Sequence, residues 1–345
     1  MNQRLIAACI AGPLVLILGG VALAVPLPYA SYSPGPTFDI LGKDSDNAEL
    51  IQVDGHKAYY DDGQIRFTTV VASGYGEKLS LGEAMSRWLD PDKAIVPYDL
   101  VHPPDSTAEQ EEAEGAIQMS TSQDTAKAVA LAEIGTKVPT AVRVAAVEED
   151  GPAQGRLLPG DIFKEVDGEP VTKPADVVDA VAKHADGSLV EFKILRDGRQ
   201  LTVRVKPEVE DDKPRVGVSV GLGYEFPFEI KLRVDPNVGG PSAGLMFALA
   251  IYDTLTPGSL TGGATVAGTG EITADGSVRP IGGIQQKIAG AEEAGAELFL
   301  VPPANCGDVE GLDPDLRLVK ATTVHDARLA LETWTKDPEA ELPAC

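Results

Sequence analysis

The chain has 345 residues, of which 43% are hydrophobic and 5% aromatic. This length leaves room for two or three domains, and their cores must consist mainly of aliphatic side chains. The formal net charge is −24 at pH 7. Such an acidic surface repels phosphate groups and argues against nucleic-acid binding. A solvated, soluble surface accounts for the charge without a specific cationic partner.

Residues 5–25 carry no charged side chain. A run of this length can cross the hydrocarbon core of a bilayer, which is about 30 Å thick. Arg4 precedes the run and no cation follows before Lys43, so the positive-inside bias places residues 1–4 in the cytoplasm and the rest outside. The alternative is a cleaved signal peptide, because Ala22-Leu23-Ala24 has the small-residue form of a cleavage site. The run is long for a signal sequence, so we expect an uncleaved, single-pass anchor in the cell membrane.

A stalk and a β-rich region are expected over residues 26–116. Residues 49–55 and 64–72 have strand-like patterns, and residues 79–89 fit a short amphipathic helix. Residues 104–115 are acidic and poor in apolar side chains, which is typical of an exposed linker or a solvated helix start. This region contains no catalytic constellation, and we interpret it as a structural spacer.

A second region, residues 117–207, begins with a predicted helix at Thr121–Ile134 that Ser122 can cap. Between two later strands lies the pattern Gly151-Pro152-Ala153, Gly160-Asp161-Ile162 and Val166-Asp167-Gly168, and a helix is expected at Pro174–Ala185. The expected strands are Val142–Val147, Leu189–Ile194 and Leu201–Val205, with a turn at Asp197-Gly198 joining the last two.

These motifs resemble a PDZ domain, particularly those of bacterial exported proteases. The resemblance implies that the domain binds an exposed protein or peptide segment as an extra strand at a sheet edge. No glycine-hydrophobic carboxylate-binding loop precedes the first strand, and the groove is assigned to Met119–Val142 without that support. The alternative is a PDZ fold that serves only as a rigid spacer or interface.

Ser242 stands in the sequence Gly239-Gly240-Pro241-Ser242-Ala243-Gly244, and an apolar run to Tyr252 follows. The run predicts a buried helix that starts near Ser242, where unpaired N–H groups and the positive end of the helix dipole are found. A serine hydroxyl there can attack a carbonyl group whose developing oxyanion meets those N–H groups. We expect Gly240 and Ala243 to support such a reaction. Taken alone, the pattern favours the simpler role of a helix-capping serine.

A nucleophilic serine needs a base. The histidines, His56, His102, His184 and His325, fit no recognisable triad signature. Lys287 lies in a helix-like segment with mostly apolar or small neighbours, but it can act as a base only if burial lowers its pKa from about 10.4 to roughly 7–8. The alternative is a surface lysine whose alkyl chain lies on apolar surface.

The Ser242 loop, the run Thr269-Gly270-Glu271-Ile272 and the run from Gly276 to Lys287 resemble, in order and spacing, the proteolytic domain of the Lon peptidase family. The resemblance covers residues 214–336 and implies a Ser–Lys dyad. Ser242 would be the nucleophile and Lys287 the general base, and the Thr269 hydroxyl would help to hold the lysine. Many Lon proteins carry an acidic residue three positions before the serine, where this chain has Gly239.

The predicted fold class is α+β, with a transmembrane helix, a β-rich segment, a PDZ domain and a Lon-type proteolytic domain. Cys306 and Cys345 would lie outside the membrane, where an oxidising environment permits a disulfide, and the sequence leaves both the bonded and the free states open. No cysteine–histidine cluster suggests a metal site, and we expect no cofactor. The expected boundaries are 1–4 cytoplasmic tail, 5–25 anchor, 26–116 stalk and β-rich region, 117–207 PDZ domain, 214–336 proteolytic domain and 337–345 tail.

The predicted function is an ATP-independent serine endopeptidase, anchored in the membrane and facing away from the cytoplasm. No Gly-x-x-x-x-Gly-Lys-Ser/Thr phosphate loop occurs in the sequence, so we expect cleavage of unfolded or flexible exported proteins. The alternative is a catalytically silent scaffold that binds exported proteins. Because Lon-type domains commonly assemble into rings, the resemblance also implies a homo-oligomer.

Overall fold

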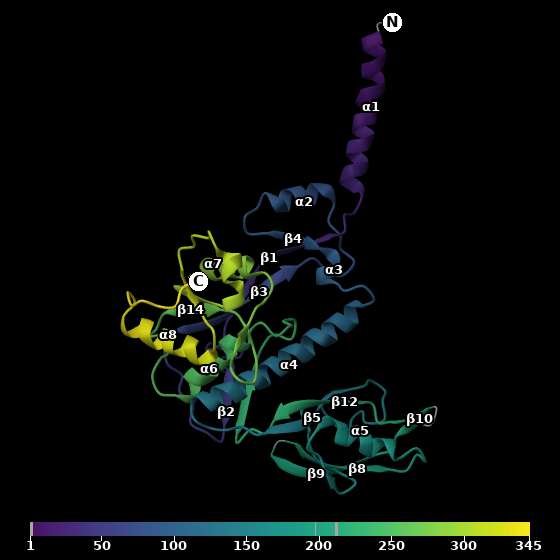
Figure 1. The fold of residues 1–345 in the computed structure, drawn as a ribbon, viewed down its shortest axis with the longest axis vertical. Helices are drawn as coiled ribbons and strands as arrows, with labels where there is room; N and C mark the ends of the chain where they lie inside the picture. The colour runs from purple at the N-terminus through teal and green to yellow at the C-terminus, as the bar shows by residue number, and fades with distance from the viewer. Residues whose placement is uncertain (1–2, 197, 211–212) are drawn as a thin grey trace.

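The computed structural model describes residues 3–196, 198–210 and 213–345, apart from the side chains of residues 4–6, 8 and 22–24. Figure 1 shows a single N-terminal helix, a larger body of helices and strands in the middle, and a smaller, strand-rich body at the opposite end. The larger body contains Ser242 and Lys287, so its construction decides the geometry of the candidate site.

Helix α1 (Gln3–Ala24) projects away from the larger body. Apolar side chains along it, such as Leu16, are exposed, and so is the free thiol of Cys9. In the described part of the chain, no helix combines the length and the apolarity that crossing a membrane requires. The anchor expected at residues 5–25 stays a prediction.

A six-stranded sheet in the order β18-β17-β14-β3-β1-β4 forms the larger body. Strand β14 pairs in parallel with β3 and β17, and β17 with β18, whereas β1 runs antiparallel to β3 and β4. The bounds are β1 Tyr29–Asp39, β3 Gln64–Ala72, β4 Ala94–Pro97, β14 Thr265–Gly268, β17 Leu298–Val301 and β18 Arg317–Lys320.

Residues 26–116 are therefore not a separate spacer, and that interpretation was wrong. Strands β1, β3 and β4 make up one side of the sheet that also holds β14. Ile65 and Phe67 of β3 are buried in the same apolar cluster as helix α6 (Gly244–Leu255). The alternation of apolar residues reveals a strand, but it does not reveal which distant strand completes the sheet.

Helix α6 runs through the centre of the larger body and is buried along nearly its whole length, as its apolar run from Leu245 to Ile251 requires. Helix α4 (Ala108–Glu133) packs along α6, and α7 (Ile284–Glu293) lies against β1 and β3. Helix α8 (Val324–Lys336) adds Ala327, Leu331 and Trp334 to the same core.

Helix α4 begins much earlier than the sequence pattern predicted. Residues for which an exposed linker or a solvated helix start was expected form its first turns, and Thr107 caps it in a reciprocal arrangement with Gln110. The Thr-x-x-Gln spacing is a capping-box signature, and Glu109 and Glu111 in the first turn suit the positive end of the helix dipole. Ser122, expected as the cap, lies in the middle of the helix.

The smaller body is a sheet in the order β12-β5-β6-β8-β9, with β7 paired to β6 and helix α5 (Pro174–Ala182) packed against it. The turn expected at residue 197 lies outside the described residues, but β8 and β9 on either side pair as a hairpin. The bounds are β5 Thr140–Val147, β6 Ile162–Val166, β7 Glu169–Pro170, β8 Val190–Arg196, β9 Arg199–Val205 and β12 Val218–Tyr224.

The boundary expected at residue 214 was wrong, because β12 belongs to the smaller body. It pairs with β5 from Val218 opposite Val147 to Tyr224 opposite Thr140. Where a short hinge was expected, β10 (Glu208–Glu210) and β11 (Lys213–Arg215) form a hairpin whose residues 211–212 lie outside the described part.

The smaller body is thus inserted into the larger one. The chain leaves the larger body after α4 and returns at β13 (Glu229–Leu232), which pairs with β2 (Ile51–Asp54). An ion pair between Asp124 and Arg143 of β5 joins the bodies at α4. Lys127 of α4 also lies 5.6 Å from the centre of the Phe226 ring, which follows β12 and packs against the core of the larger body. Helix α4 therefore contacts both the smaller body and the core around α6.

Cys306 and Cys345 form a disulfide that spans a sequence separation of 39 residues. Cys306 belongs to the 3-10 helix η1 (Pro303–Val309), and Cys345 ends the segment that follows α8. Arg317 of β18 also donates hydrogen bonds to the carbonyl groups of Pro338 and Ala340. The segment over 337–345 is therefore held against the larger body rather than hanging free.

Candidate active site

Ser242 and Lys287 lie in contact, although 45 positions separate them in the sequence. The distance between Lys287 Nζ and Ser242 Oγ is 2.8 Å. Ser242 is half-buried, just before α6, and Lys287 projects from the first turn of α7. A neutral lysine at this distance can accept the proton of the serine hydroxyl, which is the arrangement that a Ser–Lys dyad requires.

Thr269 completes the contact from the end of β14. Its hydroxyl donates to the carbonyl oxygen of Ser242 at 2.9 Å, and its oxygen lies 3.0 Å from Lys287 Nζ. The Thr269 hydroxyl donates its proton to the carbonyl oxygen of Ser242, so the hydroxyl oxygen can accept a hydrogen bond from the Lys287 amine. Thr269 therefore orients the lysine toward Ser242 and fixes the backbone of the serine.

Burial of Lys287 changes its chemistry. The side chain is 3% exposed, and desolvation of the ammonium group lowers its pKa to about 7. No carboxylate forms an ion pair with Lys287 within the described chain. A large fraction of the amine is thus neutral near pH 7, which suits a general base.

Helix α7 is held in position by two features of the chain around it. Gly283 at its start has φ 69°, and a Cβ there would lie 2.7 Å from the Val70 side chain, so only glycine fits. The buried side chain of Asn305 bonds both the amide and the carbonyl group of Ile281, at 2.9 and 3.0 Å. These contacts fix the turn that leads to Lys287.

Helix α4 holds the loop before Ser242. The amide of Gly240 donates to the carbonyl oxygen of Gly115 at 3.0 Å, and the Ser122 hydroxyl donates to that of Pro241 at 3.0 Å. A Cβ on Gly239 would lie 3.2 Å from the Cα of Gly115, so the two backbones approach closely. The contacts of Gly115 and Ser122 with this loop could not be predicted from the sequence, since no local pattern indicates a contact across more than 100 positions.

These contacts change the roles expected for Gly240 and Ala243. The Gly240 amide is used by α4, so it does not face the Ser242 hydroxyl as an oxyanion donor in this structure. Ala243 is the residue that precedes α6. Within the described residues, the amides of Ser242 and Ala243 have no protein acceptor, so they remain free to donate to a bound group.

The comparisons with known proteins match two regions of the chain, of which the first begins within α4 and ends before β12. Residues 115–206 match the PDZ domain family, and residues 236–328 match the C-terminal proteolytic domain of Lon protease (S16). This chain carries a PDZ domain and a Lon-type serine peptidase domain. The smaller body is the PDZ domain, and Ser242 and Lys287 lie in the Lon-type domain.

Individual relatives match only part of their own length. The Lon protease of Campylobacter concisus is 31% identical over 156 residues, which are 43% of this chain and 19% of that protein. Lon protease 2 of Herpetosiphon aurantiacus is 44% identical over 78 residues, which are 23% of this chain and 9% of that protein. This chain thus spans less than a fifth of each of these relatives.

Among solved structures, the PDZ domain of an SdrC-like protein from Listeria innocua is 26% identical to this chain. The likeness covers 23% of this chain and 92% of that domain, with a TM-score of 0.22. The assignment of the smaller body rests on the family match and not on this likeness.

A cavity of about 340 Å³ opens beside the dyad. Besides Ser242 and Lys287, its lining includes Phe38, Phe67 and Met119. The assignment of Met119 to the groove of the PDZ domain was therefore wrong: α4 belongs to the core of the Lon-type domain and carries Met119 to the peptidase cavity. This lining makes the cavity next to the nucleophile partly apolar.

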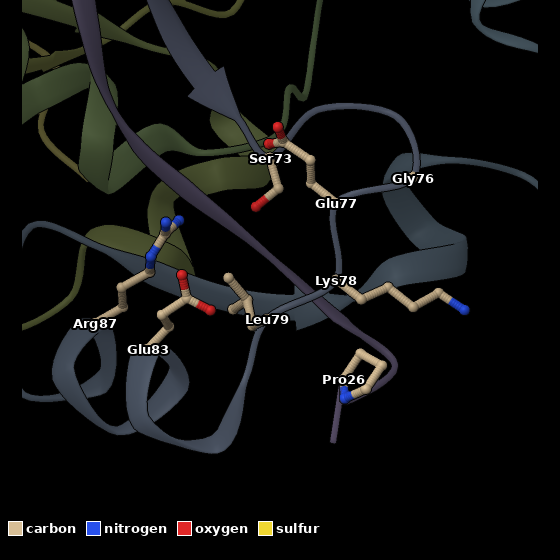
Figure 2. Close-up of a pocket in the computed structure, with 8 residues that line it drawn as sticks. All are labelled: Pro26, Ser73, Gly76, Glu77, Lys78, Leu79, Glu83 and Arg87. Atoms are coloured by element: carbon tan, nitrogen blue, oxygen red, sulfur yellow. The ribbon is translucent and has the colours of Figure 1, made fainter. Parts of the chain in front are cut away.

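The histidines lie elsewhere. His102 contacts Glu111 and the carbonyl oxygen of Ser73, and His325 contacts Glu133. Figure 2 shows another cavity, of about 460 Å³, between Pro26 and the side chains of Glu83 and Arg87 on helix α2 (Leu81–Trp88). Its lining contains none of the predicted site residues, and across the described residues no group of histidine, cysteine and carboxylate side chains is placed to hold a metal ion.

Replacing Ser122 with alanine should lower kcat for peptide hydrolysis about fivefold with little change in KM, because one hydrogen bond worth about 1 kcal/mol fixes the loop before the nucleophile. The midpoint of the pH profile should stay unchanged, since Lys287 remains buried. Steady-state kinetics on a peptide substrate measures both. Ser120→Ala, an exposed position on the same helix, is the matched control. Equal kcat values for the two variants would contradict the positioning role.

Proposed function

We propose that this chain is a serine endopeptidase that hydrolyses peptide bonds with Ser242 as nucleophile and Lys287 as general base. The observation that carries the proposal is the 2.8 Å contact between the serine hydroxyl and a lysine that is 3% exposed. A structural lysine gains nothing from such burial, whereas a base needs the lowered pKa that burial causes.

In the acylation step, neutral Lys287 takes the proton of the Ser242 hydroxyl as the serine oxygen attacks the carbonyl carbon of the substrate. The negative charge that develops on the carbonyl oxygen is stabilised by the amides of Ser242 and Ala243. The Lys287 ammonium then gives its proton to the leaving amine. Lys287 then takes a proton from water, which attacks the acyl carbon and breaks its bond to Ser242 Oγ. The carboxylic-acid product is released, and Lys287 returns the proton to the serine oxygen.

The proposed substrates are unfolded or flexible protein segments. An extended chain is the form that can place a single peptide bond beside Ser242 in a cavity of about 340 Å³. The sequence contains no Gly-x-x-x-x-Gly-Lys-Ser/Thr phosphate loop, so we propose that cleavage does not depend on ATP hydrolysis.

A catalytically silent scaffold is the competing function, because a PDZ domain on a peptidase fold could bind proteins without cleaving them. The buried contact of Lys287 with Ser242 and Thr269 favours the enzyme. An acylating serine reagent distinguishes the two: the enzyme forms an adduct at Ser242 in the folded protein, and the scaffold does not.

Peptidase activity should rise with pH through about 7 and level off above it, because protonated Lys287 cannot accept the serine proton. Ser242→Ala and Lys287→Met should each lower kcat at least about a thousandfold at every pH. Hydrolysis of an unfolded protein, followed by released amino groups, measures these rates. Lys231→Met, at an exposed lysine of β13, is the control and should keep the profile. If Ser242→Ala hydrolysed the substrate as fast as the unchanged chain, the proposed Ser–Lys dyad would be wrong.

We also propose that the PDZ domain holds the substrate at strand β12. This strand is at the end of its sheet and pairs with β5 alone among the described strands, so its outer edge has backbone groups free to pair with an added strand. Helix α5 contacts it. We assign the role of the glycine-hydrophobic loop to the pattern Val216-Gly217-Val218 at its start, since no such loop precedes the first strand of the domain.

A labelled peptide with an apolar C-terminus should bind the full chain, and Leu222→Lys on β12 or Val178→Lys on α5 should weaken it about tenfold. Both side chains are more than half exposed and apolar, and a lysine in their place removes apolar contact area. Fluorescence anisotropy measures the affinity. Val209→Lys on β10 is the control within the same part of the chain. Unchanged binding by both β12 and α5 variants would exclude this edge as the binding site.

From the charge-free sequence of residues 5–25, we propose that α1 anchors the chain in a membrane with the peptidase domain outside the cytoplasm. The full chain should sediment with membranes after a high-salt wash, and a chain that starts at Pro26 should not. External protease added to intact cells should reach the peptidase domain only in the proposed orientation. Recovery of the full chain in the soluble fraction would contradict the anchor. A homo-oligomer stays a prediction from the Lon resemblance.

A further inference from the structure

A second cavity, of about 370 Å³, adjoins the one beside Ser242. The two share Phe38, Phe67 and Asp235 in their linings. The chain runs from the second cavity to the nucleophile without leaving the site, since Val234 and Asp235 line the second cavity and Asn237 and Val238 line the first. A bound polypeptide that reaches Ser242 therefore has the second cavity next to it.

The wall between the cavities is rigid. The rings of Phe38 and Phe67 stack with their centres 5.1 Å apart, and Phe67 also contacts the edge of Phe247 in α6 at 5.4 Å. Phe67 and Phe247 belong to the buried core of the Lon-type domain. Because core side chains are close-packed, this wall is preformed and does not depend on a ligand to shape it.

The second cavity is mainly apolar. Apart from the two shared phenylalanines, its apolar lining comes from three segments of the Lon-type domain. Its charged residues already form ion pairs or hydrogen bonds with neighbouring side chains or amides. Arg233 pairs with Asp44 at 2.8 Å, and Lys43 pairs with Glu49 at 3.0 Å. The Asp235 carboxylate accepts hydrogen bonds from Asn237. The apolar residues are Ile40, Leu50, Leu232 and Val234, beside the two shared phenylalanines.

We infer that this second cavity, named here the distal subsite, binds a large apolar side chain of the substrate, such as Phe, Leu or Met, at a position not adjacent to the scissile bond. The inference rests on the proposed peptidase function and specifies its substrate. An extended chain advances about 3.3 Å per residue and alternates its side chains, so a residue further along reaches a neighbouring cavity while a carbonyl group remains at Ser242. The charged residues of the lining are already paired, so they offer little to a charged side chain of the substrate. An apolar side chain binds favourably because it removes apolar lining area from water.

Leu50 is the position at which to test the subsite. It lines the distal subsite and not the Ser242 cavity, and it lies outside the buried core cluster of the Lon-type domain. Leu50→Lys places a charge in the subsite and leaves the dyad untouched. Leu312→Lys is the matched control, because Leu312 is 39% exposed and lines neither cavity.

The substrates are matched ten-residue peptides in which one position at a time, on either side of the scissile bond, carries Phe or Ala. At one non-adjacent position, Phe should give at least about a tenfold higher kcat/KM than Ala. Leu50→Lys should reduce that ratio to about one and leave the rate for the Ala peptide unchanged, while Leu312→Lys keeps the ratio. A ratio near one at every non-adjacent position in the unchanged chain, or an equal loss for both peptides in Leu50→Lys, would overturn the subsite.

Binding separates this inference from the proposed function. Fluorescence anisotropy with the same peptides and the Ser242→Ala chain should show about tenfold tighter binding of the Phe peptide, and adding Leu50→Lys should cancel the difference. If the unchanged chain cleaves nothing but this difference is found, the subsite stands and the peptidase proposal fails. If cleavage occurs and neither kinetics nor binding distinguishes Phe from Ala, the peptidase proposal stands and the distal subsite is wrong.

Discussion

An amine that is buried beside a serine hydroxyl, without a carboxylate partner, is the interaction on which the rest of this structure depends. Lowering the pKa of Lys287 from 10.5 to about 7 corresponds to roughly 5 kcal/mol of lost solvation for the charged form. Burial by the surrounding fold imposes that cost, although Lys287 still lines the cavity beside Ser242. Helix α6 behind Ser242 is buried along its length, and α7 lies against β1 and β3, so both residues of the dyad stand on elements held by a large apolar core.

Helix α4 connects this chemistry to the rest of the chain. Gly115 and Ser122 hold the loop before the nucleophile, and Met119, between them, lines the cavity in which a peptide would lie. A few residues further on, Asp124 forms an ion pair with Arg143 of the PDZ domain. Because the PDZ domain is inserted between α4 and β13, both of its connections lead to segments that shape the site.

Several features of the site followed from local patterns. The apolar run after Ser242 predicted α6, the spacing of the glycines and Lys287 indicated the Lon-type domain, and the mostly small and apolar neighbours of Lys287 allowed its burial. Other features were missed because their signals were local but misread. The Thr107–Gln110 capping box marks the start of α4 in a stretch whose acidic composition left both an exposed linker and a solvated helix start open. The strand over Val216–Val220 was assigned to the proteolytic domain, although β12 pairs with β5 in the smaller body.

The sequence by itself identified Ser242, Thr269 and Lys287 as candidates for the chemistry, since they stand in motifs that resemble the Lon family in order and spacing. Only the tertiary structure decided that β1 and β3 share a sheet with β14, that β12 belongs to the PDZ domain, and that α4 holds the nucleophile loop. The physical reason is that a strand or helix pattern reports which face must be buried but not what buries it. The partner is selected by packing and hydrogen bonding across the whole chain, and in this protein α4 contacts the Ser242 loop across more than 100 positions.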